Sequence, residues 1–188
     1  MERQLATSLD GIHVGHVERY KFACTLIKGR VLDAACGCGY GSKMMEESGC
    51  RVVGVDIDNQ TIQHARKHFP GPGYLIGDIL DIPWAGRFDW IVSFETIEHL
   101  PKAMEALRIF RHHGSHLIVS SPNQIWYPFD PRKFDGDRYP HVRHYTPDEL
   151  EERLIAANWK VLSRHCQKSK KGSVVDGTDG VFMSFVCE

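Results

Sequence analysis

The chain has 188 residues, with 23 basic and 24 acidic side chains and a formal net charge of −1 at pH 7. This length suits one domain with a sizeable core. The balanced charge argues against a protein built to grip long nucleic acid or an anionic membrane surface. The chain has six cysteines but no C-x-x-C pair, no signal-peptide pattern and no run of 18 apolar residues. We therefore expect reduced thiols and a cytoplasmic location without membrane association.

Strand-like and helix-like segments alternate along the chain. Residues 1–28 are expected to form a helical cap. Strands are expected at 30–34, 51–56, 74–77, 88–94 and 116–120, and helices at 42–48, 61–69, 102–111 and 147–157. Thr146 and Glu149 form a capping box before the last of these helices. Two late strands, 159–165 and 181–187, have only a polar loop between them. This order predicts an α/β, doubly wound, mostly parallel sheet with a C-terminal antiparallel hairpin.

The most informative stretch is Val31 to Ser42, VLDAACGCGYGS, in which an apolar strand leads into a glycine-rich turn. Glycine lets such a turn bend tightly and approach a ligand closely. A second strand ends in Asp56, at the place of a ribose-binding acid. GDI, at residues 77–79, ends a third strand. Three strand ends in this order indicate a nucleotide-like ligand at one edge of the sheet.

Together these motifs resemble the class I S-adenosylmethionine (SAM) methyltransferases, over roughly residues 20–187. The resemblance implies a Rossmann-like seven-stranded sheet, a single domain over 1–188 and SAM as cofactor. It assigns these residues to SAM: Asp33, Gly37, Gly39, Asp56, Ile57, Asp78, Ile79, Phe94, Arg19 and Tyr20. Among them, Asp33 is expected to orient the methionine part and the adjacent loop, although it could also cap the turn. Arg19 and Tyr20 could instead be a surface arginine and a core tyrosine.

A second motif, E-x-x-E-H, follows the fourth strand. If a helical turn begins there, Glu95, Glu98 and His99 project from one face. Two carboxylates and an imidazole together are typical of a site for Mg²⁺ or Mn²⁺, completed by His141 or, failing that, His144. The other reading is a metal-free pocket in which these residues are still catalytic and His99 is the general base.

The same motif occurs in two methyltransferase groups. One resembles the ubiquinone-biosynthesis O-methyltransferases, and the other comprises the small-RNA 3′-terminal 2′-O-methyltransferases. In both, the motif and a later histidine bind a divalent ion, and by spacing His141 is the closer match to that histidine. Both groups methylate one oxygen of a vicinal pair, so the resemblance implies transfer to a hydroxyl.

The segment 121–145 shows no regular pattern and is expected to be a substrate lid. Its aromatic and basic side chains suit a ring or sugar that carries negative charge, or a stacked nucleotide. The motif of DNA amino-methyltransferases is absent from the sequence. We therefore expect a methyltransferase that acts on a small molecule or sugar. The alternatives are an RNA-end or nucleotide methyltransferase and a non-catalytic SAM-binding partner or sensor.

Overall fold

The structure is a computed structural model that describes residues 5–81, 86–134, 136 and 140–188; parts of the predicted cap (1–4) and lid (135, 137–139) lie outside the described residues. The strands are β1 (Arg30–Ala34), β2 (Arg51–Asp56), β3 (Gly73–Ile76), β4 (Phe88–Ser93), β5 (Gly114–Pro122), β6 (Val161–Gln167), β7 (Val175–Asp176) and β8 (Phe182–Cys187). The helices are α1 (Val14–Cys24), α2 (Tyr40–Glu47), α3 (Asn59–His68), α4 (Ala103–His113) and α5 (Pro147–Ala156), with 3-10 turns η1 (Leu9–Gly11), η2 (Ile97–His99) and η3 (Pro131–Lys133).

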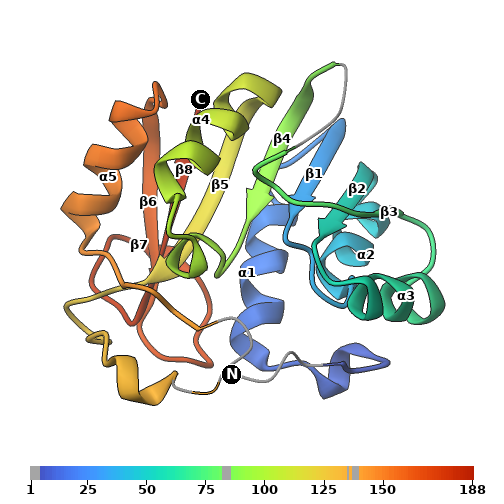
Figure 1. Ribbon diagram of the computed structural model, residues 1–188, viewed down its shortest axis with the longest axis horizontal. Helices are drawn as coiled ribbons and strands as arrows, with labels where there is room; N and C mark the ends of the chain where they lie inside the picture. The colour runs from blue at the N-terminus through green and yellow to red at the C-terminus, as the bar shows by residue number, and fades with distance from the viewer. Residues whose placement is uncertain (1–4, 82–85, 135, 137–139) are drawn as a thin grey trace.

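Within the described residues the strands form one eight-stranded sheet in the order β3-β2-β1-β4-β5-β8-β6-β7 (Figure 1). Strands β1 to β5 pair in parallel, and β8 lies antiparallel between β5 and β6. The predicted Rossmann-like sheet with its antiparallel C-terminal pair is confirmed. Seven strands were predicted, and β7 is the additional one. Only two residues of β7 pair with β6, and so short a strand shows no alternation of apolar and polar residues.

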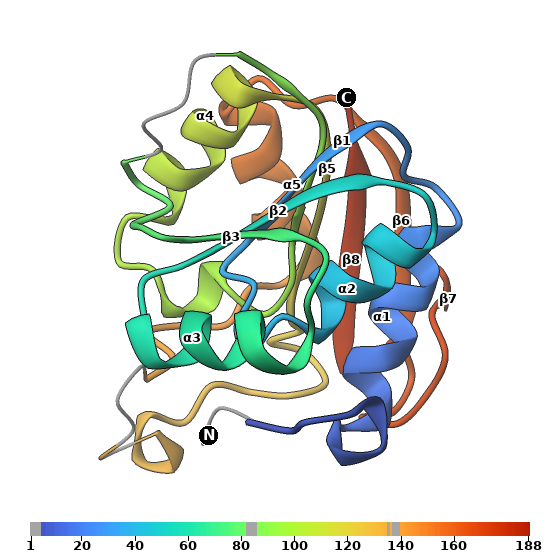
Figure 2. The same cartoon turned by 90° about the vertical axis from the view of Figure 1, so that its right-hand side faces the viewer.

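Helices cover both faces of the sheet: Figure 2 shows α1 and α2 on one side and α4 and α5 on the other, and α3 packs through Ile62 and Ala65 against Tyr74 of β3. The alternation of side chains along β1 explains this arrangement. Val31 packs with Tyr20 and Met45 on the first face, whereas Leu32 packs with Phe110 on the second. Because both faces are covered, the central strands are apolar along most of their length.

Trp159 marks the main shift in an element boundary. It was expected to begin a strand, but its backbone N–H donates to the Leu154 carbonyl at the end of α5. Its indole Nε1 donates to the Leu107 carbonyl on α4, 3.0 Å away, so this buried side chain joins the two helices. Strand β6 therefore begins only at Val161. The capping box of Thr146 and Glu149 is present as predicted.

Strand β1 lies between β2 and β4. The strands β2 and β3 are added on one side of β1, and β4 and β5 on its other side. In an open parallel sheet, a ligand binds where the strand order reverses, outside the carboxyl ends of the strands. The loops after β1, β2 and β4 meet at that point. In the described part of the chain, no helix is long and apolar enough to cross a membrane.

Candidate active site

A cavity of about 390 Å³ lies at the carboxyl ends of β1, β2 and β4. Eight of the ten residues predicted to hold the cofactor line it: Arg19, Tyr20, Gly37, Asp56, Ile57, Asp78, Ile79 and Phe94. Glu95, His99 and His141 line the same cavity. The structure thus brings the two sequence motifs together around one space. Asp33 and Gly39, by contrast, do not line it.

A larger and more open groove, of about 700 Å³, lies beside the carboxyl end of α4. None of the predicted site residues line it. Arg87 and Arg111 in this groove donate to the backbone carbonyls of Gly114 and Asn158, so their charges support the local fold. We therefore place the candidate active site in the smaller cavity.

Gly37 and Asp56 connect the glycine-rich turn to the end of β2. The Gly37 N–H donates to Oδ2 of Asp56 at 3.0 Å, and the Asp58 N–H donates to Oδ1 at 2.9 Å. Gly37 has a φ of +55°, and a Cβ placed on it would meet no atom within 4 Å. Asp58 is the N-cap of α3, and its side chain accepts from the Thr61 N–H. The turn therefore leaves open space beside Gly37 and next to a carboxylate.

Gly39 has a packing role that was not predicted. Its φ is +88°, and a Cβ there would lie 2.6 Å from Cβ of Ala65 and 2.8 Å from the Tyr74 hydroxyl oxygen. The absence of a side chain lets the start of α2 pack against α3 and β3. Gly37 is the turn glycine that lines the cavity, and the expectation that the Gly39 backbone approaches the ligand stays a prediction.

Asp33 lies behind the cavity. It is fully buried and accepts hydrogen bonds from the Tyr20 hydroxyl at 3.0 Å and from Oγ of Ser42 at 2.6 Å. Burial raises its pKa to about 7, against the opposing effect of these two donors. Asp33 therefore links β1 to Tyr20 on α1 and to Ser42 on α2, and its predicted role toward the methionine part stays a prediction.

Arg19 is a buried cation, with only 1% of its surface exposed. Its Nη1 donates to Oε1 of Gln167 at 2.5 Å, and its guanidinium lies 4.7 Å from the centre of the Phe182 ring. Among the described residues, Nε and Nη2 of Arg19 have no hydrogen-bond partner. Gln167 also donates to the carbonyls of Gly15 and Gly172. A buried arginine with unused donors is suited to an anionic group in the cavity.

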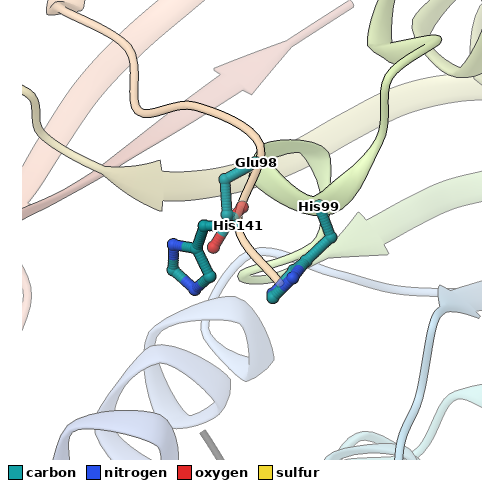
Figure 3. A group of neighbouring side chains, drawn as sticks. All are labelled: Glu98, His99 and His141. Carbon is teal, nitrogen blue, oxygen red and sulfur yellow. The ribbon is translucent and has the colours of Figure 1, made fainter. Parts of the chain in front are cut away.

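Glu98, His99 and His141 form the second half of the site. One potential ligand atom from each lies within 4.8 Å of the others. Figure 3 shows the side chains converging, with Glu98 and His99 from η2 and His141 from the 121–145 segment. The Val142 N–H donates to the Glu98 carbonyl at 2.8 Å, which fixes this approach. The segment is thus anchored to η2.

The Glu98 carboxylate is completely buried, and neither of its oxygens has a hydrogen-bond partner among the described residues. Burial, together with the nearby charge of Glu95, raises the pKa of Glu98 well above its usual value. Such a carboxylate is costly to ionise unless a cation or a proton donor lies beside it.

Glu95 does not join this group, contrary to the prediction that three side chains share one face. Its φ is +49°, an unusual value for a residue with a side chain. Its N–H donates to Oγ of Ser120, which in turn donates to Oε1 of Glu95 at 2.8 Å. The chain forms a 3-10 turn only from Ile97, so Glu95 precedes the turn and is directed toward β5.

His144 lies behind His141, and the two rings share a hydrogen bond. The other ring nitrogen of His144, Nδ1, lies 2.6 Å from the Tyr127 carbonyl oxygen. His141 is therefore the histidine that joins Glu98 and His99, in agreement with the spacing argument. Gln167 was missed by the sequence argument, because its role depends on contacts with the distant residues Arg19 and Gly15.

Comparison with known proteins shows which protein family this chain resembles. A family model described as a methyltransferase domain matches residues 32–119. A probable S-adenosylmethionine-dependent methyltransferase of Mycolicibacterium smegmatis is 34% identical over 136 residues, covering 70% of this chain and 52% of that relative. A ubiquinone biosynthesis O-methyltransferase of Nitrosospira multiformis is 26% identical over 106 residues, covering 53% of this chain and 43% of that relative. The chain spans about half the length of these curated relatives.

The fold is also shared with solved structures. The structure of the CcbJ methyltransferase from Streptomyces caelestis superposes with a TM-score of 0.76, covering 96% of this chain and 98% of that chain. The two sequences are 14% identical, so this likeness concerns the fold alone.

Proposed function

The chain belongs to the class I SAM-dependent methyltransferases, and we propose that it transfers the SAM methyl group to a hydroxyl of a small molecule or sugar. One observation carries the proposal: a single cavity is lined by the cofactor-matching residues and by His99 and His141. Such an enzyme mainly has to hold donor and acceptor in line for displacement at the sulfonium methyl. The ubiquinone O-methyltransferase among its relatives supports oxygen as the acceptor atom.

The cofactor half of the proposal follows from the donors and acceptors that line the cavity. Asp56 would accept hydrogen bonds from the ribose hydroxyls, because a carboxylate offers two acceptor oxygens to two donors. Asp78 would accept from the adenine amino group, with Ile57 and Ile79 beside the ring. Arg19 would donate to the methionine carboxylate through Nε and Nη2, the donors without partners in the described structure.

The acceptor half offers two routes to an activated hydroxyl. His99 can take the hydroxyl proton as a general base. Alternatively, Glu98, His99 and His141 would hold Mg²⁺ or Mn²⁺, and their buried, unpartnered carboxylate beside two imidazoles fits such an ion. A bound divalent ion would lower the pKa of the acceptor hydroxyl. Glu95 would then not bind the ion directly and would act on Glu98 through its nearby charge.

The experiment is a transfer assay with methyl-labelled SAM against separated metabolite, glycan and RNA fractions, each with and without chelator. Label in the metabolite or glycan fraction supports the proposal. Label confined to RNA supports the RNA-end activity, which the E-x-x-E-H motif also favours. SAM binding with no transfer to any fraction would indicate a SAM-binding partner or sensor instead.

A further inference from the structure

The rim of the cavity carries positive charge that the methyl-transfer chemistry does not use. Tyr127 lines the cavity, and two lysines from separate segments approach its ring. Nζ of Lys170 lies 4.5 Å from the ring centre, and Nζ of Lys133 lies 5.8 Å from it. Lys170 follows β6, whereas Lys133 ends η3. Two loops thus bring ammonium groups to one aromatic side chain at the cavity.

The beginning of α1 adds to this positive region. The pKa of His13, the N-cap of α1, is lowered by burial and then by the positive charges of Arg19, Lys171 and Lys170. The geometry agrees for Lys170, because a Cβ on Gly15, in the first turn of this 11-residue helix, would lie 2.0 Å from the Lys170 carbonyl oxygen. The amino end of the helix carries the positive pole of the helix dipole, which also favours an anion.

Two described acids close to these lysines in sequence or space, Asp130 and Glu18, are engaged elsewhere. Asp130, three residues before Lys133, pairs with Arg132. Glu18 pairs with Lys21 and accepts a hydrogen bond from Ser173. Among the ion pairs of the described residues, none includes Lys133, Lys170 or Lys171. Within the described residues, these lysines of the rim therefore have no ion-pair partner.

We propose that the methyl acceptor is a phosphorylated small molecule, whose phosphate lies against Lys133, Lys170 and Lys171 and whose ring or sugar lies on Tyr127. This inference rests on the proposed function, because the acceptor hydroxyl must reach His99 in the same cavity. Lysine binds phosphate as a point charge and needs no fixed bidentate geometry. Two ammonium groups at one aromatic ring, with Lys171 next to Lys170 in the sequence, suit one phosphate or diphosphate group. A nucleic acid would require a longer basic stripe, and the formal net charge of the chain is only −1.

The test uses inorganic pyrophosphate as probe, measured by calorimetry at low salt with the SAM product S-adenosylhomocysteine present. We expect pyrophosphate to bind the native chain and to bind the double variant Lys133→Glu/Lys170→Glu about tenfold or more weakly, because the charge of the rim is reversed. Lys28→Glu is the control. It reverses one charge instead of two, at an exposed site just before the amino end of β1 and therefore at the opposite end of this strand from the cavity, and should leave pyrophosphate binding unchanged.

Two results would overturn the inference. One is a native chain that does not bind pyrophosphate, or a double variant that binds it equally well. The other is tight binding of a single-stranded RNA oligomer that pyrophosphate does not displace. SAM affinity measured on the same samples separates this inference from the proposed function. Normal SAM affinity in the double variant with lost pyrophosphate binding supports the rim, whereas a native chain that fails to bind SAM contradicts the proposed function itself.

Discussion

Nδ1 of His141 lies 2.7 Å from Nε2 of His144, and this contact determines where the protons of both rings lie. The Tyr127 carbonyl can only accept, so Nδ1 of His144 carries a proton. Burial lowers the pKa of His144 and favours its neutral form, in which Nε2 accepts from Nδ1 of His141. A neutral His141 then has its lone pair on Nε2. This is the form that a general base or a metal ligand requires.

The first prediction concerns this pair. His144→Phe keeps a buried ring but removes the acceptor for His141. Methyl transfer should fall by about 10- to 100-fold, as for other partners that orient a functional histidine. SAM affinity should stay nearly unchanged. His144→Gln, which keeps a carbonyl acceptor, should retain more activity than His144→Phe; equal losses in both would indicate a purely structural role.

The second prediction concerns the cofactor carboxylate. Asp56→Ala should weaken SAM binding by about 1–3 kcal/mol, because the ribose hydroxyls lose a charged acceptor. Asp58→Ala is the matched control, since Asp58 caps α3 and does not line the cavity. It should lower stability by about 0.5–2 kcal/mol and leave SAM affinity unchanged. Calorimetry that finds the same SAM affinity in Asp56→Ala as in the native chain would remove Asp56 from the site.

The third prediction separates the two turn glycines. Gly39→Ala should destabilise the fold by about 2–4 kcal/mol, because its Cβ would press on Ala65 and its backbone is left-handed. Gly37→Ala should destabilise the fold by only the backbone cost of about 1–2 kcal/mol. It should mainly weaken SAM binding, because its Cβ would meet no protein atom and would occupy space at the cavity that the cofactor needs. Thermal unfolding and SAM titration of both variants test this. The reverse pattern would mean that Gly39, not Gly37, contacts the cofactor.

The fourth prediction is a pH dependence of stability. The native pKa of Asp33 is raised from 3.8 to about 7. Between these values the unfolded chain has released this proton while the folded chain still holds it, so the free energy of unfolding falls as pH rises. Asp33→Asn does not titrate. Its stability relative to the native chain should increase by up to about 3–5 kcal/mol between pH 4 and pH 8.

Denaturant unfolding of both proteins across this range is the measurement. Taking the difference between the two proteins removes the contributions of most other titrating groups. A difference that does not change with pH would show that Asp33 has an ordinary pKa.

The elements that carry the cofactor motif could be predicted because each is local in sequence. Asp33 and Asp56 lie at the carboxyl ends of their strands, and the glycine turn follows the first strand. The ends of these strands mark the point at which the strand order of the sheet reverses. The role of Glu95 could not be predicted, because Ser120, which holds its carboxylate, lies 25 positions away. Gln167 lies 148 positions from Arg19, and no local pattern connects the two residues. Packing against α3, which assigns Gly39 its role, is likewise visible only in three dimensions.

The fifth prediction concerns the divalent ion. If Glu98, His99 and His141 hold one, excess chelator should abolish transfer and leave SAM binding nearly intact, because the group lies in the acceptor half of the cavity. Glu98→Ala should then reduce turnover by several powers of ten. Adding back Mg²⁺ or Mn²⁺ to the native chain is the control. Full activity in excess chelator would decide for the metal-free route.

The central claim is that one cavity binds SAM and transfers its methyl group through His99. The most direct measurement compares SAM affinity and methyl transfer in the native chain, in His99→Ala and in the control His112→Ala, whose exposed side chain lies on α4 away from this cavity. The account predicts that all three bind SAM alike. Transfer should be unchanged in His112→Ala and reduced by about 10²- to 10⁴-fold or more in His99→Ala. Undiminished transfer by His99→Ala would contradict it.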